Sequence, residues 1–131
     1  MEKSLICLDT SVLIDFYRKT DKSKSFLFQL TEKYDRFAIS AITEFEIFIG
    51  SKSDQDDYWD RLFSTMKKLP FDSKSNKIAI NIDRKLKQIS KQIEVPDLMI
   101  AACAMANDAT IATLNAKHFS RIDGLKLIIP E

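Results

Sequence analysis

The chain has 131 residues and a mass of 15.1 kDa, which fits one compact domain. With 45% hydrophobic residues, 30% charged residues and only two glycines, the composition excludes a disordered, collagen-like or low-complexity chain. No apolar run approaches the roughly 20 residues of a membrane-spanning helix, and the N-terminus lacks the features of a signal peptide. Cys7 and Cys103 lie in apolar runs and form no CxxC pair, so we expect buried thiols in a cytoplasmic protein.

The net charge of +1 is distributed unevenly along the chain. Residues 67–91 contain eight Lys or Arg against two acids, and four aspartates lie just upstream, between 54 and 60. A basic segment of this kind is either a solvated helix face or a surface that attracts a polyanion. Composition alone leaves both interpretations open.

Short apolar strands alternate with helices along the chain. Residues 4–8 form the continuous apolar run of a strand buried on both faces, and Asp9 provides capping chemistry for a helix over 12–18. Further strands are expected at 37–40, 69–71, 110–113 and 127–129, and further helices at 22–34, 40–50, 58–66, 78–93 and 97–106. This alternation predicts a single α/β domain over residues 1–131, a three-layer α/β/α sandwich with a mainly parallel central sheet.

Three acids and one amide occupy comparable places in this pattern. Asp9 directly follows the first strand, Glu46 lies on the helix after the second, and Asp97 stands in the first turn of a helix. Asn115 follows the strand that ends near residue 113. Because ligands of parallel sheets bind beyond the carboxyl ends of the strands, we expect these four side chains to converge at one edge.

Carboxylates gathered at one edge repel each other and lose hydration unless a cation lies among them. Mg²⁺ or Mn²⁺ meets this need, because hard divalent cations prefer oxygen ligands, whereas a single histidine argues against zinc. Such an ion polarises a phosphodiester and lowers the pKa of a bound water. Taken singly, Asp9 and Asp97 also fit helix caps, and Glu46 also fits a surface acid. Their common placement favours the metal site.

Four motifs then follow one another in order: LDTSVLIDFYR at 8–18, ISAITEFEIFIG at 39–50, VPDLMIAACAMAND at 95–108 and IATLNAKHFSRIDGL at 111–125. With them the chain resembles, over essentially its whole length, the PIN domain and in particular the compact VapC-type toxins of toxin–antitoxin (VapBC) pairs. Ser40, Thr43, Glu46 and Gly50 match the family spacing Ser-x-x-Thr-x-x-Glu-x-x-x-Gly, which favours Glu46 over the neighbouring Glu44.

The resemblance implies a toxin that is an endoribonuclease dependent on Mg²⁺ or Mn²⁺. Asp9 and Asp97 would be its principal metal ligands, and Glu46 would bind the metal directly or through water, or position the attacking water. The family often has Asp at the position of Asn115, so this chain departs from the pattern there and a strong second metal site is in doubt. The alternatives are a non-toxin PIN nuclease that processes RNA or cuts structured DNA, and a catalytically silent PIN binding module.

Other side chains near the acids have candidate supporting roles. Those that would hydrogen-bond the carboxylates, or equally cap helices, are Thr10, Ser11 and Thr43. Those that would contact RNA are Lys117, His118 and Arg121, together with the basic residues of 74–91. For His118, a surface or packing role is the alternative.

The resemblance also implies two protein partners, namely a second copy in a symmetric dimer and a small antitoxin that lies in a hydrophobic groove near the acids. The helices expected at 22–34 and 58–66 carry apolar side chains that one small core would not fully absorb. These side chains are Phe26, Leu27, Leu30, Trp59, Phe63 and Met66. We therefore expect them to contribute to partner surfaces, the alternative being that all of them pack inward.

Overall fold

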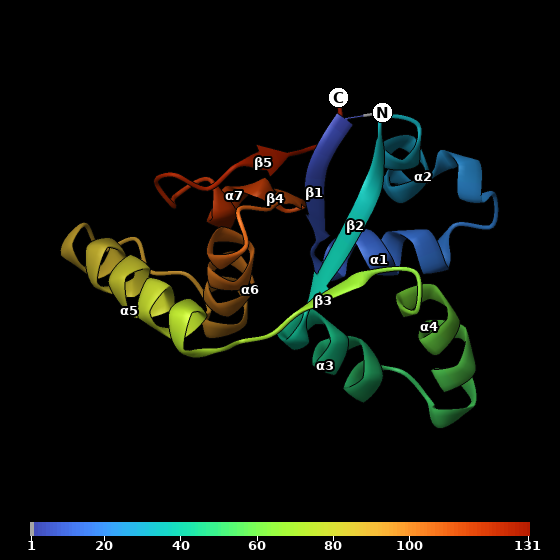
Figure 1. The fold of residues 1–131 in the computed structure, drawn as a ribbon, viewed down its shortest axis with the longest axis horizontal. Helices are drawn as coiled ribbons and strands as arrows, with labels where there is room; N and C mark the ends of the chain where they lie inside the picture. Colours follow the sequence, from blue (N-terminus) through green and yellow to red (C-terminus); the bar gives the residue numbers. More distant parts are fainter. Residues whose placement is uncertain (1) are drawn as a thin grey trace.

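The computed structural model describes residues 2–131 and contains one five-stranded sheet in which every neighbouring pair of strands is parallel (Figure 1). The strand order is β3-β2-β1-β4-β5. The strands are β1 (Glu2–Leu8), β2 (Tyr34–Ser40), β3 (Lys67–Leu69), β4 (Thr110–Ala112) and β5 (Leu127–Ile128). The predicted α/β class with a parallel central sheet is confirmed.

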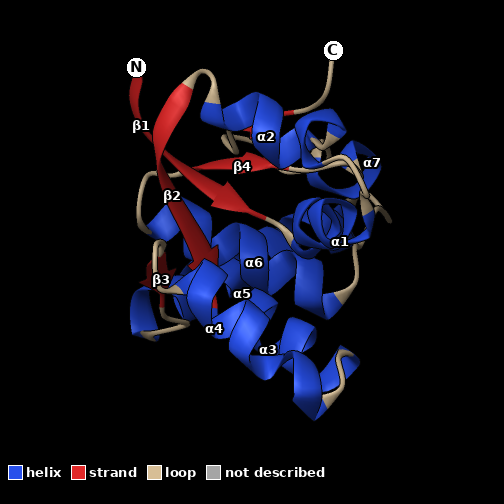
Figure 2. Ribbon diagram, turned by 90° about the vertical axis from the view of Figure 1, so that its right-hand side faces the viewer, coloured by secondary structure: helices blue, strands red, loops and turns tan. Residues whose placement is uncertain are grey.

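Helices cover both faces of this sheet. The α-helices are α1 (Thr10–Arg18), α2 (Phe26–Thr31), α3 (Ala41–Gly50), α4 (Asp56–Phe63), α5 (Ser73–Gln88), α6 (Val95–Ala106) and α7 (Ala116–Phe119), with 3-10 turns η1 (Lys22–Lys24) and η2 (Ser53–Gln55). Figure 1 shows α1, α2 and α4 on one side of the sheet and α5 and α6 on the other, and Figure 2 views the molecule from the side of α1, α2 and α4. Successive β1 side chains point to opposite faces: Leu5 and Cys7 pack with α5 and α6, whereas Ile6 and Leu8 pack with α1, α2 and α4. The result is the predicted three-layer sandwich.

The register of the strands brings their carboxyl ends to one edge. Leu8 of β1 pairs with Ala112 of β4, and the backbone N–H of Asp9 donates to the Ala112 carbonyl at 3.2 Å. On the other side, Cys7 pairs with Ala38, so Asp9 lies level with Ser40, the last residue of β2. The residues that follow β1, β2 and β4 therefore meet at this edge.

Several predicted boundaries are wrong. The helix expected over 22–34 is interrupted at Ser25, whose hydroxyl caps α2 by accepting from the N–H of Phe28, and β2 already begins at Tyr34. The strand expected at 69–71 ends before Pro70, which has no N–H to donate. The helix expected at 58–66 starts at residue 56 and ends at 63.

The helix expected over 78–93 begins and ends earlier. The Asp72 carboxylate caps its start by accepting from the N–H of Ser75 at 3.0 Å. Its end is set by Ser90, which has a φ of 54°, and by the N–H of Lys91, which donates back to the Leu86 carbonyl. The short helix α7 was not predicted at all.

The expectation that α2 and α4 carry partner-binding apolar side chains is also wrong. Phe26, Leu27, Leu30, Trp59 and Phe63 are all buried against the sheet. Met66 is partly buried against the same cluster. The core therefore absorbs this set, because α2 and α4 turn their apolar sides toward Ile6 and Leu8.

Both cysteines are free and buried, as predicted. Burial raises the pKa of the Cys7 thiol to about 12 and that of Cys103 to about 11, so neither is a thiolate near neutral pH. Among residues 2–131, no helix has the length and apolar character needed to cross a membrane.

Candidate active site

Asp9 follows β1 directly and is only 5% exposed. Its carboxylate caps α1: Oδ1 accepts from the hydroxyl of Ser11 and from the backbone N–H of Val12 at 3.3 Å. Oδ2 accepts from the hydroxyl of the fully buried Thr113, which follows β4. Burial raises the pKa of the Asp9 carboxyl above its ordinary value, and the hydrogen bonds from Ser11, Thr113 and Val12 act in the opposite direction.

Glu46 lies on α3, and its carboxylate accepts a hydrogen bond from a residue of α1. The Thr10 hydroxyl donates to Glu46 Oε1 at 2.8 Å and lies 3.4 Å from the hydroxyl of the buried Thr43. Ser40 caps α3 by accepting from the Thr43 N–H at 3.0 Å. The neighbouring Glu44 instead forms an ion pair with Lys68 at 2.8 Å. The structure therefore places Thr10 beside Glu46, Thr43 beside Thr10, and Ser11 beside Asp9.

Asp97 lies in the first turn of α6, whose N-cap is Glu94. The Oδ2 atom of Asp97 is 3.4 Å from Nδ1 of His118, the single histidine, on α7. Both side chains are partly sheltered, with 27% of Asp97 and 31% of His118 exposed. This contact joins two segments that lie 21 residues apart in the sequence.

Asn115 is exposed at the start of α7, and its backbone contributes to the site. Its N–H donates to the Thr113 hydroxyl at 2.9 Å, and the N–H of Leu114 donates to Ser11 at 3.1 Å. The segment after β4 is thus bonded to Asp9 and to its partner Ser11. Thr113 was missed as a site residue, although its place at the end of a strand expected to share an edge with Asp9 was a usable signal.

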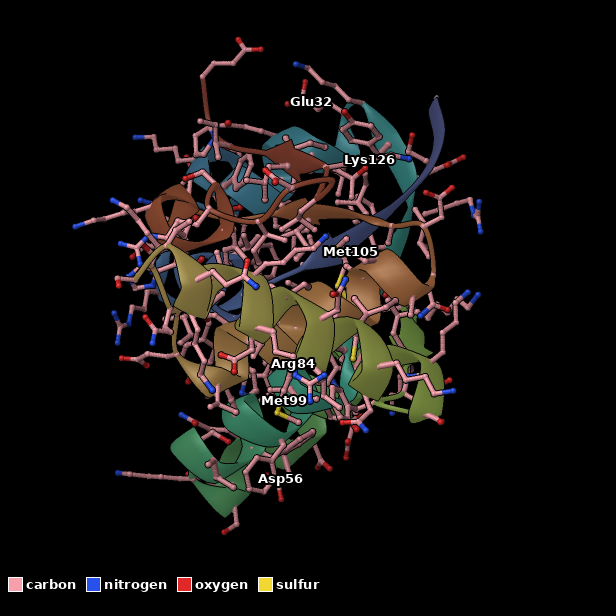
Figure 3. The ribbon with its side chains drawn as sticks, turned by 90° about the vertical axis from the view of Figure 1, so that its left-hand side faces the viewer. Glu32, Asp56, Arg84, Met99, Met105 and Lys126 are labelled. Carbon is pink, nitrogen blue, oxygen red and sulfur yellow. The ribbon has the colours of Figure 1, made fainter. Side chains whose placement is uncertain are left out.

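The basic residues expected to contact RNA differ in their surroundings. Lys117 is exposed. Arg121 donates from Nη1 to the carbonyl of Gln92 at 3.0 Å and lies 3.5 Å from that of Lys91, and His118 contacts Asp97. Further exposed cations lie along α5, where Figure 3 shows Arg84 on the outer side of the helix. These α5 cations are Lys74, Lys77, Arg84, Lys85 and Lys87.

The surface beside the acids is hollowed on both sides of α1. A cavity of about 180 Å³ adjoins Glu46 and is lined also by Tyr17, Gln55 and Trp59. A wider hollow of about 530 Å³ adjoins Ser11 and Leu114. One hollow therefore reaches Glu46, and the other reaches Ser11, whose hydroxyl is bonded to Asp9.

The chemistry of these donors, which are carboxylate oxygens, suits a hard divalent cation. Asp9 is a buried carboxylate whose bonded partners in the described chain are hydroxyls and a backbone N–H, which leaves its charge without a cation. Glu46 and Asp97 add carboxylate oxygens from helices at the same edge. Within residues 2–131, however, no three His, Cys, Asp or Glu side chains are grouped closely enough to hold an ion together. The three acids are instead separate, and each has its own partners. Asp9 is bonded to Ser11 and Thr113, Glu46 to Thr10, and Asp97 contacts His118.

Comparison with known proteins agrees with this fold. The family model of the PIN domain matches residues 6–125, and the chain therefore belongs to the PIN-domain family. Within that family, Ribonuclease VapC3 of Methanocaldococcus jannaschii is 37% identical over 95 residues, which are 72% of this chain and 93% of that protein. Ribonuclease VapC1 of the same organism is 31% identical over 129 residues, covering 96% and 88% of the two chains. The chain is thus a member of the VapC ribonuclease family.

Solved structures share the whole architecture. The crystal structure of VapBC2 from Rickettsia felis, bound to a DNA fragment from the promoter, contains a chain that superposes with a TM-score of 0.84. The two chains are 28% identical, and the match covers 97% of this chain and 99% of the other.

Proposed function

We propose that this protein is an endoribonuclease dependent on Mg²⁺ or Mn²⁺ and the toxin of a VapBC-type toxin–antitoxin pair. The observation that carries the proposal is the buried Asp9 at the end of β1, with Glu46 and Asp97 on helices at the same edge of the sheet, in a member of the VapC ribonuclease family. A buried carboxylate without a cationic partner is costly to keep ionised, and a bound divalent cation removes that cost.

Asp9, Asp97 and Glu46 would hold the ion, which when bound polarises the scissile phosphodiester and lowers the pKa of a water. Ser11 and Thr113 fix the two oxygens of Asp9, so that this ligand needs no reordering when the substrate arrives. Thr10 engages Oε1 of Glu46, and the remaining oxygen would bind the ion or orient a water for in-line attack on phosphorus. Asn115 adds a neutral amide where the family often has an acid, which favours a single strongly bound ion.

RNA would be held by cations near this edge. Lys117 is exposed one residue from His118, and the cations of α5 form a second group of suitable charge. Contacts of this kind bind phosphates and do not select a sequence.

The same family membership supports two partners and a location. A VapBC2 assembly is among the solved structures of similar fold, and we propose a VapB-like antitoxin for this chain. The hollows beside Glu46 and Ser11 suit a segment of such a partner, which would block the acids. We further propose a homodimer that acts in the cytoplasm, where the buried thiols of Cys7 and Cys103 stay reduced.

The proposal is tested by RNA cleavage with purified protein in Mg²⁺ or Mn²⁺, and again with excess EDTA. We expect cleavage with either ion and none with EDTA, and restoration when the ion is added back. Asp97→Asn should abolish cleavage. The matched control is Asp108→Asn, the same change at an exposed acid just beyond α6, which should cleave like the wild type. Cleavage that persists in EDTA, or in the Asp97→Asn variant, would refute the proposed site.

A further inference from the structure

We infer that His118 is a positioning residue whose imidazole holds the Asp97 carboxylate in place for the metal. The inference rests on the proposed function, because it assigns His118 to the metal site and not to the RNA. The contact of Nδ1 with Asp97 Oδ2 at 3.4 Å is the observation that points to it. A proton on Nδ1 makes that nitrogen the donor, and it then engages one of the two carboxylate oxygens.

The helix that carries His118 is itself anchored. The next residue, Phe119, is 1% exposed and packs in the core with α6 residues such as Leu98 and Ala102. This anchoring fixes the backbone of α7 against α6. The imidazole therefore meets Asp97 from a rigid support, even though α7 has only four residues.

Arg121, two residues beyond α7, helps to hold the loop that precedes α6. Its guanidinium donates to the carbonyl of Gln92, in the loop that leads from α5 into α6. The segment 115–121 thus holds the approach to α6 through Arg121 and the Asp97 carboxylate through His118. At its other end, the Asn115 N–H is bonded to Thr113, which in turn donates to Asp9. One short segment therefore connects the two acids that we propose as principal ligands.

Hydrogen-bond donors behind a metal ligand fix its orientation, and their loss typically weakens metal binding or activity by about 10-fold to 100-fold. With a contact of 3.4 Å, we expect the lower end of that range. His118→Leu removes the donor and retains an apolar side chain. His118→Asn retains a donor, because the Asn side-chain nitrogen lies close to the place of Nδ1.

The test is calorimetric titration of the purified variants with Mn²⁺, together with kcat and KM for RNA cleavage. We expect His118→Leu to weaken Mn²⁺ binding about tenfold, to lower kcat, and to leave KM near that of the wild type. His118→Asn should recover most of both losses. Ser120→Ala, at the exposed residue that follows α7, is the control and should bind Mn²⁺ like the wild type.

A His118→Leu variant that binds Mn²⁺ normally and shows only a raised KM would overturn the inference and assign His118 to RNA. If the leucine variant fails to fold, His118→Gln replaces it, because its donor lies near the position of Nε2 and should not rescue Mn²⁺ binding as Asn does. Equal Mn²⁺ affinities for the Asn and Gln variants would then overturn the inference. A wild-type protein that binds Mn²⁺ but cuts no RNA refutes only the proposed function, since the comparison of Mn²⁺ affinities still decides the role of His118.

Discussion

Asp9 has two roles at once, since it caps α1 and stands as a buried acid at the edge of the sheet. The cap stabilises the fold, whereas the burial of an ionised carboxylate destabilises it. Its hydrogen bonds favour the ionised form, whereas burial penalises that form and raises the pKa of Asp9 above its ordinary value of 3.8. Burial is the larger effect, so the ionised carboxylate destabilises the metal-free fold.

The raised pKa of Asp9 makes the stability of the metal-free chain depend on pH. A raised pKa means that the native chain binds more protons at Asp9 than the unfolded chain does, so this group lowers stability as pH rises above about 4. Asp9→Asn removes that effect while keeping a polar side chain of the same size. In buffer with EDTA, its melting temperature should exceed that of the wild type at pH 7, with a smaller difference near pH 4. A lower melting temperature than the wild type at neutral pH would contradict this account.

Asn115 is the position at which a single substitution should strengthen the site. Asn115→Asp adds a carboxylate oxygen at the edge, and the residue is exposed, so folding should be unaffected. We expect tighter Mn²⁺ binding in a calorimetric titration, with a higher or broader nuclease activity. An unchanged Mn²⁺ affinity would show that Asn115 lies too far from the ion to matter.

At the scale of elements, the sequence predicts the buried strands and the helices that follow them well. Their apolar runs end at polar capping residues such as Asp9 and Ser40, which leave a clear local signal. The helix expected over 22–34 was wrong because apolar residues repeat at helical spacing on both sides of the Ser25 cap. The early start of α5 was missed because residues 73–77 are polar, and Asp72 alone marks that start.

The candidate site shows the same division between local and distant information. Spacing along the chain predicts that Asp9, Glu46 and Asp97 belong to one edge, because strand ends and helix starts are local features. It does not predict that Thr113 bonds Asp9 or that His118 contacts Asp97. Those contacts join residues 104 and 21 positions apart and depend on how the strands and helices pack.

The cap of α5 provides a test at this scale. The backbone N–H and then the hydroxyl of Ser75 lower the pKa of Asp72, so the native chain binds fewer protons there than the unfolded chain. This stabilisation is present above pH 4 and is lost as pH falls through the lowered pKa. Asp72→Ala should therefore reduce the melting temperature at pH 7 and much less near pH 2. Asp72→Asn keeps the hydrogen-bond acceptor without the charge, so its melting temperature at pH 7 should lie between those of the wild type and Asp72→Ala. A deficit for Asp72→Ala that stays constant with pH would contradict the role of the charge.

At the scale of the whole molecule, exposed apolar side chains lie elsewhere than the sequence suggested. Phe45 and Ile49, one turn apart on α3, are 63% and 67% exposed, whereas the aromatic residues of α2 and α4 named above are mostly buried. Neighbouring exposed apolar side chains of this size are typical of a contact surface. They lie on the helix that also carries Glu46, so a contact there would be close to the candidate site.

We predict that the protein is a homodimer, with a mass twice the 15.1 kDa of one chain in light scattering at tens of micromolar. Phe45→Ser should shift the equilibrium toward the monomer, whereas Phe28→Ser, at an exposed aromatic residue on α2, should not. A wild-type monomer at that concentration would contradict the prediction and would leave the proposed nuclease activity untouched.

Sequencing of RNA 5′ ends after brief induced expression tests most directly whether the acids at the sheet edge cleave RNA. Cells that express the wild-type chain should accumulate new 5′ ends at a restricted set of positions and should stop growing. Cells that express Asp97→Asn at the same level should show neither effect. The absence of new ends with the wild type, or the same ends with Asp97→Asn, would contradict the account.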